Sequence, residues 1–301
     1  MTVDGVPIAD TFAEAFGMVA ARAILTADTA AWAEVAARTM TGYATSVIAC
    51  DAEAAIERIL SPDETPDGRP GVSILAFSFG RDGLEKALSN RVGQCVMTCP
   101  TSACYNGLPV GEKTISVGGR LRYFGDGHQR SKRLNGRRYW RIPVMDGEFT
   151  CEDIFGTTKG VAGGNLILMG DDPASTLRAA EAAAAAARCV PGVILPFPGG
   201  IARSGSKVGS KYKALKASSN GAFAPSLRGL VPSELPDSAT CAYEIVIDGL
   251  TLDAVERATA DAIRAGCLPG ILGISAGNYG GKLGPYHVRL REVLARYPAG
   301  G

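Results

Sequence analysis

The chain has 301 residues, of which 46% are hydrophobic and 20% are charged, and this composition is typical of a soluble globular protein of one large or two ordinary domains. Its 31 basic and 30 acidic side chains give a net charge of +1, which excludes a general attraction to nucleic acid. No run of about 20 apolar residues is long enough to cross a membrane, and the first residues lack a secretory signal pattern. We expect a cytoplasmic protein with eight reduced cysteines.

The first hundred residues predict two strand–helix–strand units in succession. The expected strands are 22–26, 44–50, 71–79 and 95–98, and the expected helices are 29–40 and 82–92. Trp32 is expected on the apolar face of the first helix. Residues 115–155 then change to short alternating runs, and 121–127 and 138–144 predict the strands of a hairpin.

This middle segment also holds a dense basic stretch. It consists of Arg130, Lys132, Arg133, Arg137, Arg138 and Arg141. A solvated charged face and an anion-binding surface both account for such a pattern.

The second half contains one strand–helix–strand unit twice, at a shift of 78 positions. The pairs are strands 165–169 and 243–247, helices 174–188 and 252–266, strands 189–194 and 267–272, and loops 198–200 and 276–278. With a three-residue gap, 207–209 then matches 282–284. A match of this length, with the same proline and glycine after each helix, predicts a duplicated scaffold.

Two such units within about 100 residues favour an α+β fold of two ferredoxin-like, split-βαβ lobes, each an α/β sandwich. We expect an N-terminal lobe over residues 1–155, extended by the inserted β-hairpin segment, and a C-terminal lobe over 156–301 that contains the internal repeat. A single doubly wound parallel sheet is the alternative, and it would require longer crossovers.

The glycine-rich loops that follow the repeats are the first candidate site. Residues 200–207 come close to a phosphate-binding P-loop, but Ser206 precedes Lys207, whereas that motif places lysine before the hydroxyl. Backbone N–H groups, Arg203 and Lys207 are suited to an anionic or carbonyl group. A substrate loop, a pair of structural turns and a nucleotide site all remain open, and residues 278–284 repeat the same chemistry.

Glu244 is the second candidate, because it is a carboxyl flanked by the apolar residues of a strand. Its partner at the shift of 78 is Leu166, so one repeat is apolar where the other is acidic. A buried carboxyl has a raised pKa and stays protonated near neutral pH, which suits a general acid.

Metal chemistry is not indicated by the sequence. Its two histidines, His128 and His287, stand apart from any zinc motif. Cys95, Cys99 and Cys104 have the wrong spacing for an iron–sulfur cluster, and packing positions are the expected role. We expect no metal.

Several long strings resemble the formylmethanofuran:tetrahydromethanopterin formyltransferase family. They are TFAEAF at 11–16, TPDGRPGV at 65–72, RVGQCVM at 91–97, GVAGGN at 160–165, PFPGGI at 196–201, SKVGSK at 206–211, ISAGN at 274–278 and GGKLG at 280–284. The resemblance implies two α/β lobes, a homotetramer, no prosthetic group, and methanofuran and tetrahydromethanopterin as substrates. The implied reaction moves a formyl group between a pterin nitrogen and the primary amine of the furan carrier.

The resemblance also implies roles for individual residues. Glu244 matches the family's protonated acid beside the reacting carbonyl, and both glycine-rich loops are expected to bind the carriers. The substrate-binding candidates are Gly199, Gly200, Arg203, Ser206, Lys207, Gly209, Ser275, Gly277, Asn278, Tyr279, Gly281 and Lys282.

The near-neutral charge resembles the bacterial members of the family more than the acidic archaeal ones. It implies a subunit of a formyltransferase/hydrolase complex that works in the direction of formaldehyde oxidation, with the basic stretch holding a glutamyl tail or an acidic partner. Two other functions remain open, namely a non-catalytic scaffold subunit of such a complex and a nucleotide-binding enzyme that uses residues 200–207.

Overall fold

The computed structural model describes residues 1–298, and these residues form two compact units. One unit consists of residues 18–160, and the other combines residues 1–17 with residues 161 onward. The division along the chain therefore falls near residue 160. The first seventeen residues belong to the same compact unit as the C-terminal half of the chain, whereas the sequence predicts that they belong to the N-terminal lobe. No helix among the described residues is long and apolar enough to cross a membrane.

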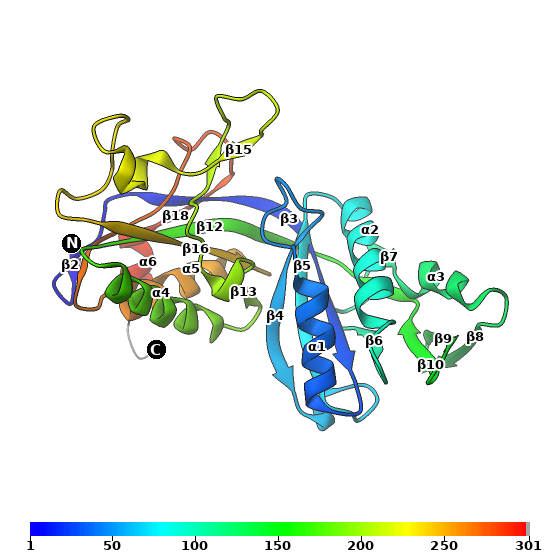
Figure 1. The fold of residues 1–301 in the computed structure, drawn as a ribbon. Coiled ribbons are helices and arrows are strands. Elements are labelled where there is room, and N and C mark those ends of the chain that lie inside the picture. Colours follow the sequence, from blue (N-terminus) through cyan, green and yellow to red (C-terminus); the bar gives the residue numbers. More distant parts are fainter. Residues whose placement is uncertain (299–301) are drawn as a thin grey trace. The chain divides into compact units, whose positions relative to one another are not determined.

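The unit of residues 18–160 contains a mixed sheet with the strand order β4-β5-β3-β6-β10-β9-β8. Helices α1 and α2 pack against β5, and both appear in front of this sheet in Figure 1. The bounds of the elements are β3 (Phe12–Thr26), α1 (Ala30–Thr41), β4 (Glu53–Leu60), β5 (Gly71–Ser78), α2 (Arg81–Arg91), β6 (Ala103–Asn106), β7 (Thr114–Ser116), α3 (Gly118–Leu121), β8 (Arg130–Leu134), β9 (Arg137–Val144), β10 (Gly147–Glu152) and β11 (Ile154–Gly156).

Three predicted strands of this unit are wrong. Residues 44–50 form turns, because the eight residues of β4 take the pairing with β5. Residues 95–98 continue from α2 through a π-helical turn, since Val92 and Val96, four residues apart, are both buried. Residues 121–127 run from the end of α3 into a 3₁₀ turn, and the expected strand does not form.

The predicted place of Trp32 is also wrong. Its side chain is 43% exposed. Helix α1 buries Ala33, Ala36, Ala37 and Met40, which follow the spacing of one helical stripe. Trp32 stands next to that stripe, so its ring lies at the edge of the buried face.

The second unit is built on a sheet with the order β13-β16-β12-β17. Helices α4 and α5 cover one face, while residues 203–240 arch over the other (Figure 1). The bounds are β1 (Thr2–Val3), β2 (Val6–Pro7), β12 (Thr158–Gly170), α4 (Pro173–Arg188), β13 (Val193–Ile194), β14 (Lys207–Val208), β15 (Ala217–Ser218), β16 (Cys241–Gly249), α5 (Leu252–Gly266), β17 (Ile271–Ser275), β18 (Tyr286–Arg289) and α6 (Leu290–Arg296).

Alternation along β12 separates two cores in this unit. Leu166 and Leu168 belong to the larger core beneath the helices. Ile167 and Met169 point the other way and pack with Phe223 and other apolar residues of the overlying segment. Any polar side chain that shares the face of Ile167 therefore lies under the segment of residues 203–240.

The structure corrects the register of the repeat in its first strand. Ile245 lies in the helix-side core, as Leu166 does, and these residues are 79 positions apart. The helix N-caps, Asp172 and Thr251, are also 79 apart, whereas β13 and β17 begin 78 apart. The residue equivalent to Glu244 is therefore Asn165, and its expected pairing with Leu166 is wrong by one position, which in a strand means the opposite face.

Candidate functional site

The site begins with Glu244 in the middle of β16. Glu244 stands opposite Ile167 of β12, so its side chain lies on the face beneath residues 203–240. Its exposed fraction is 2%. A carboxyl in such a place needs hydrogen-bond partners, because an unpaired polar group is costly to bury.

Asn165 and Ser206 provide these partners. Asn165 Nδ2 donates to one carboxyl oxygen at 2.5 Å, and Ser206 Oγ donates to the other at 3.0 Å. Burial raises the pKa of Glu244, and these hydrogen bonds oppose the rise without cancelling it. Glu244 therefore keeps its proton to a higher pH than an exposed glutamate does.

A cavity of about 430 Å³ opens beside Glu244 within this unit. Its wall combines apolar side chains, such as Ile167 and Phe223, with polar ones, such as Arg203 and Asn220. A hollow that combines apolar walls with convergent polar groups is a suitable place for a small-molecule site.

The loop after β13 approaches Glu244 through its backbone and through Ser206. Ala202 and Glu244 exchange two backbone hydrogen bonds, of 2.8 and 2.9 Å, which fix the loop to β16. Gly199 and Gly200 have φ values of +61° and +79°, and a Cβ on Gly200 would lie 2.8 Å from the Leu195 side chain. The two glycines therefore have a conformational role.

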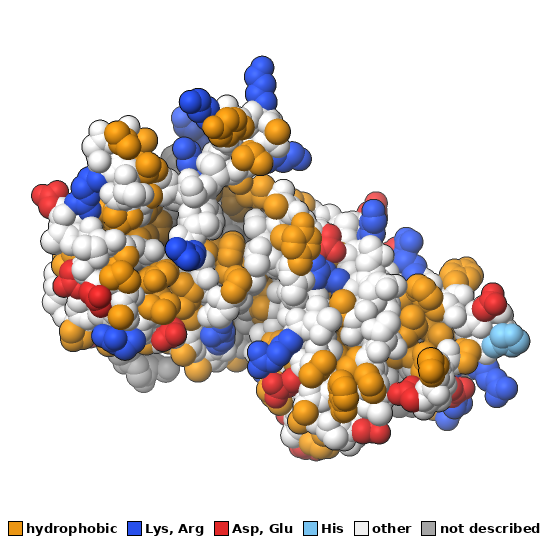
Figure 2. Space-filling model, in the orientation of Figure 1, with side chains coloured by type: hydrophobic (Ala, Val, Ile, Leu, Met, Phe, Trp, Pro, Cys, Tyr) orange, Lys and Arg blue, Asp and Glu red, His pale blue; other side chains and the backbone are white. Residues whose placement is uncertain are grey.

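The outer part of this loop carries the remaining candidates. Arg203 is exposed and lines the cavity. Lys207 is exposed in β14, opposite Ser218, and Gly209 turns the same hairpin at φ +86°. Figure 2 shows Lys and Arg side chains gathered on the projecting segment around β15.

The loop after β17 reaches the site through Asn165. Ser275 stands opposite Ile167, and the Gly277 N–H donates to Asn165 Oδ1 at 2.8 Å. Asn278 Nδ2 donates to Thr11 Oγ1 at 3.0 Å. The loop is thus fixed both at Asn165 and at Thr11, the residue before β3.

The further residues of this loop differ in how closely they are held. The backbone N–H groups of Tyr279 and Gly281 donate to the Glu14 carboxylate, and the Tyr279 ring is half-buried. Lys282 is exposed. The structure therefore brings Glu244, Ser206, Gly277 and Tyr279 into one region, while Lys207, Gly209 and Lys282 lie on outer parts of the loops.

Three residues of the candidate site were not among the residues predicted from the sequence. Asn165 joins Glu244 to the second loop, Phe223 lines the cavity, and Glu14 holds the backbone of the second loop. An amide directly before the apolar run of β12 was the available signal for Asn165. Phe223 comes from an irregular segment without periodicity, so the sequence offered no signal for it.

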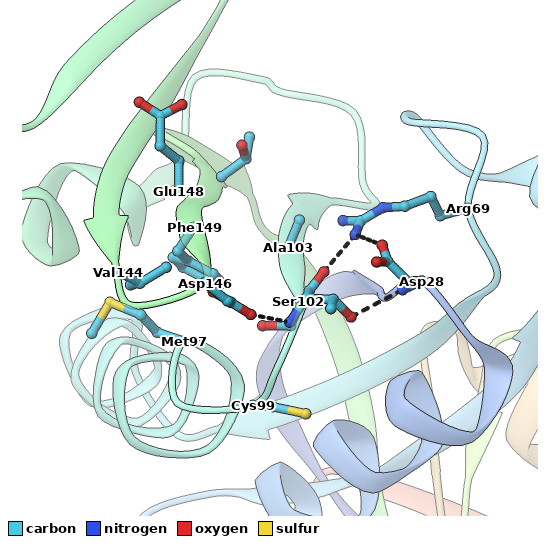
Figure 3. A pocket seen from close by; sticks show the side chains of 12 residues that line it. Asp28, Arg69, Met97, Cys99, Ser102, Ala103, Val144, Asp146, Glu148 and Phe149 are labelled. Carbon is cyan, nitrogen blue, oxygen red and sulfur yellow. Dashed lines mark hydrogen bonds and ion pairs between the residues drawn. The ribbon is translucent and has the colours of Figure 1, made fainter.

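A second cavity, of about 200 Å³, lies in the unit of residues 18–160 and is shown in Figure 3. Its charged groups are engaged with the protein. Arg69 Nη1 donates to Asp28 at 2.9 Å and to the Thr101 carbonyl at 2.5 Å, and Asp146 accepts from the Thr101 N–H at 2.8 Å. These contacts hold loops together, so we place the candidate site at Glu244.

The basic stretch is partly neutralised by acidic side chains of its own unit. Arg137 pairs with Glu152 at 2.5 Å, Arg138 lies 3.7 Å from Asp153, and Arg141 pairs with Glu148. The cations of β8, by contrast, are exposed. They are Arg130, Lys132 and Arg133.

Within residues 1–298 no group of three or more His, Cys, Asp or Glu side chains is arranged to hold a metal ion. His287 lies in β18 with its ring 4.5 Å from that of Phe12, and His128 is exposed in a turn. All eight cysteines are free thiols.

Two family models together match nearly the whole chain. The one described as formylmethanofuran-tetrahydromethanopterin formyltransferase matches residues 1–144, and the one described as its proximal lobe matches residues 147–293. The enzyme of that name from Methylococcus capsulatus is 56% identical over 98% of this chain and 100% of that protein.

Solved structures agree in both sequence and fold. A chain of the formyltransferase/hydrolase complex from Methylorubrum extorquens, solved with methylofuran, gives a TM-score of 0.94 at 51% identity, covering 99% of each chain. The Methanosarcina barkeri formyltransferase gives 0.91 at 48% identity, covering 97% of this chain and 100% of that one. The chain belongs to the formylmethanofuran–tetrahydromethanopterin formyltransferase family.

Proposed function

We propose that this chain transfers a formyl group between a ring nitrogen of tetrahydromethanopterin and the primary amine of a methanofuran-type carrier. The observation that carries the proposal is the buried Glu244 carboxyl of a chain in this family, which lies beside a cavity, hydrogen-bonds Ser206 of the first glycine-rich loop and is joined to the second loop through Asn165. A non-catalytic scaffold would have no use for a carboxyl with a raised pKa in such a place.

The reaction needs positioning and proton transfer. The acceptor amine attacks the formyl carbon, a C–N bond forms, and the carbonyl oxygen gains negative charge in the tetrahedral intermediate. The bond from that carbon to the donor nitrogen then breaks. Neutral Glu244 supplies a proton to the leaving nitrogen, and its carboxylate then takes a proton from the attacking amine, so the protons balance over one turnover.

The two loops are assigned to carrier binding. Arg203, Ser206 and Tyr279 are the candidates nearest Glu244, and Lys207 and Lys282 are assigned to anionic groups farther out. Gly199, Gly200, Gly209, Ser275, Gly277, Asn278 and Gly281 are assigned to shaping the two loops. Both carriers are substrates, and no prosthetic group is part of the proposal.

The assignment of each unit to the split-βαβ, ferredoxin-like class belongs to the same proposal. The orders β4-β5-β3-β6 and β13-β16-β12-β17 support it, because each places the first strand of one βαβ unit beside both strands of the other. We also propose that the two lobes divide between residues 155 and 156, close to the division of the chain near residue 160.

The proposed setting is cytoplasmic, as a homo-oligomer such as a tetramer and as a subunit of a formyltransferase/hydrolase complex that works in the oxidative direction. The Methylorubrum extorquens structure, in which a similar chain is part of such a complex, supports the second state.

The exposed cations of β8 are the proposed contact for an acidic tail or partner. Arg137 and Arg138 are poor choices for a test, since reversing their charge would also break pairs with Glu152 and Asp153. Replacing Arg130 and Arg133 by Glu is the cleaner change. An unchanged KM for the furan carrier together with intact assembly would remove this role.

The proposed function is tested by formyl transfer with the purified chain. Formyl-tetrahydromethanopterin is supplied with and without the furan carrier, and formylated carrier is measured. Turnover that requires the furan amine is the expected result. No turnover by a folded chain would favour the scaffold alternative, and calorimetric binding of ATP would favour the nucleotide alternative.

A further inference from the structure

Glu14 is a second buried carboxyl in the same unit, and the proton transfers described above do not use it. It lies in the first part of β3, opposite His287 of β18, and its exposed fraction is 1%. Among the described residues no cationic side chain forms an ion pair with it. Its charge is balanced in another way.

Four backbone N–H groups of one short loop surround this carboxylate. One oxygen accepts from Leu283 at 2.5 Å and from Gly284 at 2.6 Å. The other accepts from Tyr279 at 2.7 Å and from Gly281 at 3.0 Å. The loop thus folds around Glu14 as a backbone nest for an anion, with the anion supplied by the protein.

The glycines of the loop permit this arrangement. Gly280 and Gly281 both have φ +71°, and a Cβ on Gly281 would lie 2.9 Å from the His287 ring. A Cβ on Gly284 would lie 2.3 Å from the Ala15 carbonyl oxygen. Side chains at these places would push the loop off the carboxylate, so its shape depends on Glu14 and the glycines together.

The same loop contacts the Glu244 site at its other end. The Gly277 N–H donates to Asn165 Oδ1, and Asn165 Nδ2 donates to Glu244. The Tyr279 side chain is close enough to both carboxyls to be influenced by their charges. Burial raises the pKa of Tyr279, and the charges of Glu244 and Glu14 raise it further. A shift of this loop would therefore move groups that fix or face Glu244.

We infer that Glu14 is a positioning residue for formyl transfer: its carboxylate sets the shape of residues 277–284 and so places Tyr279 and Asn165 at the Glu244 site. This inference rests on the proposed function. Glu14 itself touches neither carrier and exchanges no proton in the reaction.

The Glu14→Gln variant tests the inference at constant size. Glutamine presents an –NH₂ group where Glu14 has an accepting oxygen, so two of the four backbone N–H groups then face a donor. Amide hydrogen exchange should quicken at Tyr279, Gly281, Leu283 and Gly284. The kcat should fall by about 10²-fold, because small displacements of positioned groups have effects of that size, and KM for the carriers should rise by a smaller factor because the same loop is assigned to carrier binding.

Glu256→Gln is the matched control. Glu256 is a buried carboxyl of the same unit, but it lies in α5 on the helix side and pairs with Arg296. Its loss should lower the free energy of unfolding and leave both loop exchange and kcat unchanged. Should Glu14→Gln fail to fold, Gly281→Ala distorts the same nest with Glu14 intact and should give the same two effects.

The outcomes separate this inference from the proposed function. A wild-type chain without formyl transfer would contradict the proposed function before any variant is made. With an active wild type, the inference is overturned by a folded Glu14→Gln variant that keeps slow exchange in the loop. It is equally overturned by a variant with fast exchange and an unchanged kcat.

Discussion

The two repeats of the C-terminal unit share a scaffold but differ in the loop that follows it. Each runs from a central strand through an alanine-rich helix to a further strand, β12–α4–β13 and β16–α5–β17. After β13 the chain forms backbone hydrogen bonds with Glu244 through Ala202 and then continues into an exposed hairpin that is rich in lysine. After β17 it folds tightly around Glu14.

The duplication places two polar side chains at equivalent positions on the central strands β12 and β16. Asn165 and Glu244 occupy the same place in their repeats, on the face away from the helices, and they hydrogen-bond to each other. The duplicated strands therefore bring two polar side chains side by side. One is the carboxyl that we propose as the acid, and the other is an amide that hydrogen-bonds this carboxyl and the second loop.

The largest effect is expected from Glu244→Gln, which makes both central strands carry an amide. The kcat should fall by about 10²–10⁴-fold, because the proposed proton donor and acceptor is lost. Steady-state kinetics of formyl transfer measures this. A folded variant with full activity would remove Glu244 from the chemistry.

The difference in unfolding free energy between this variant and the wild type should depend on pH. The folded state keeps the Glu244 proton above the ordinary pKa of 4.5, whereas the unfolded state loses it, so the wild type loses unfolding free energy as pH rises through the raised pKa. Glutamine does not titrate. Urea unfolding at several pH values should show that the unfolding free energy of the variant rises relative to that of the wild type from acid to neutral pH. A difference in unfolding free energy that does not change with pH would contradict the raised pKa.

Leu166→Ala tests the corrected register of the repeat. Leu166 lies in the core beneath the helices, so the cavity should lower the free energy of unfolding by about 2–5 kcal/mol while KM stays unchanged. Ile167→Ala is the matched change on the other face, where the side chain lines the cavity, and it should also raise KM. Equal effects of both variants on KM would contradict the separation of the two faces.

Asn165→Ala removes the group that joins the repeats. Glu244 loses one of its two side-chain donors and the Gly277 N–H loses its acceptor, at a cost of about 1–3 kcal/mol in unfolding free energy. The kcat should fall as well, but by less than in Glu244→Gln. Chemical unfolding and kinetics on the same preparation test this, and an unchanged kcat would show that the amide is only structural.

The smallest effects are expected where the repeats are alike. Asp172 caps α4 by accepting from the Ser175 N–H at 2.8 Å, and Thr251 caps α5 by accepting from the Ala254 N–H at 3.1 Å. Replacing either by Ala should lower unfolding free energy by about 0.5–2 kcal/mol and leave kcat unchanged. Thermal unfolding of both variants compares them, and a loss of activity in only one would reveal a functional asymmetry in the helices.

The sequence was sufficient for features that depend on local pattern. The helices of the two repeats show helical periodicity in the sequence, and proline and glycine residues mark the loops that follow them. These signals lie within a few residues of each other along the chain, so the places of these elements were predictable. The strand expected at 95–98 does not form, because an apolar run of that length is compatible with both a strand and the buried face of a helix. Val92 and Val96 are both buried when this segment is helical, and their packing favours the helical form.

The site was predictable only in part, for a physical reason. Glu244 could be found because an acid in an apolar strand is unusual on its own. Glu14 could not, since the amides that surround it come from residues about 265 to 270 positions later in the chain. The equivalence of Asn165 and Glu244 depends on which face each side chain takes, and a one-residue error in strand register hides it.

The protonation state of Glu244 at neutral pH tests the central claim most directly. The infrared difference spectrum of wild type minus Glu244→Gln, recorded at neutral pH and again at alkaline pH, isolates this carboxyl. A carboxylic acid C=O band at neutral pH that gives way to a carboxylate band at alkaline pH is the predicted result. A carboxylate band alone at neutral pH would contradict the assignment of Glu244 as the acid.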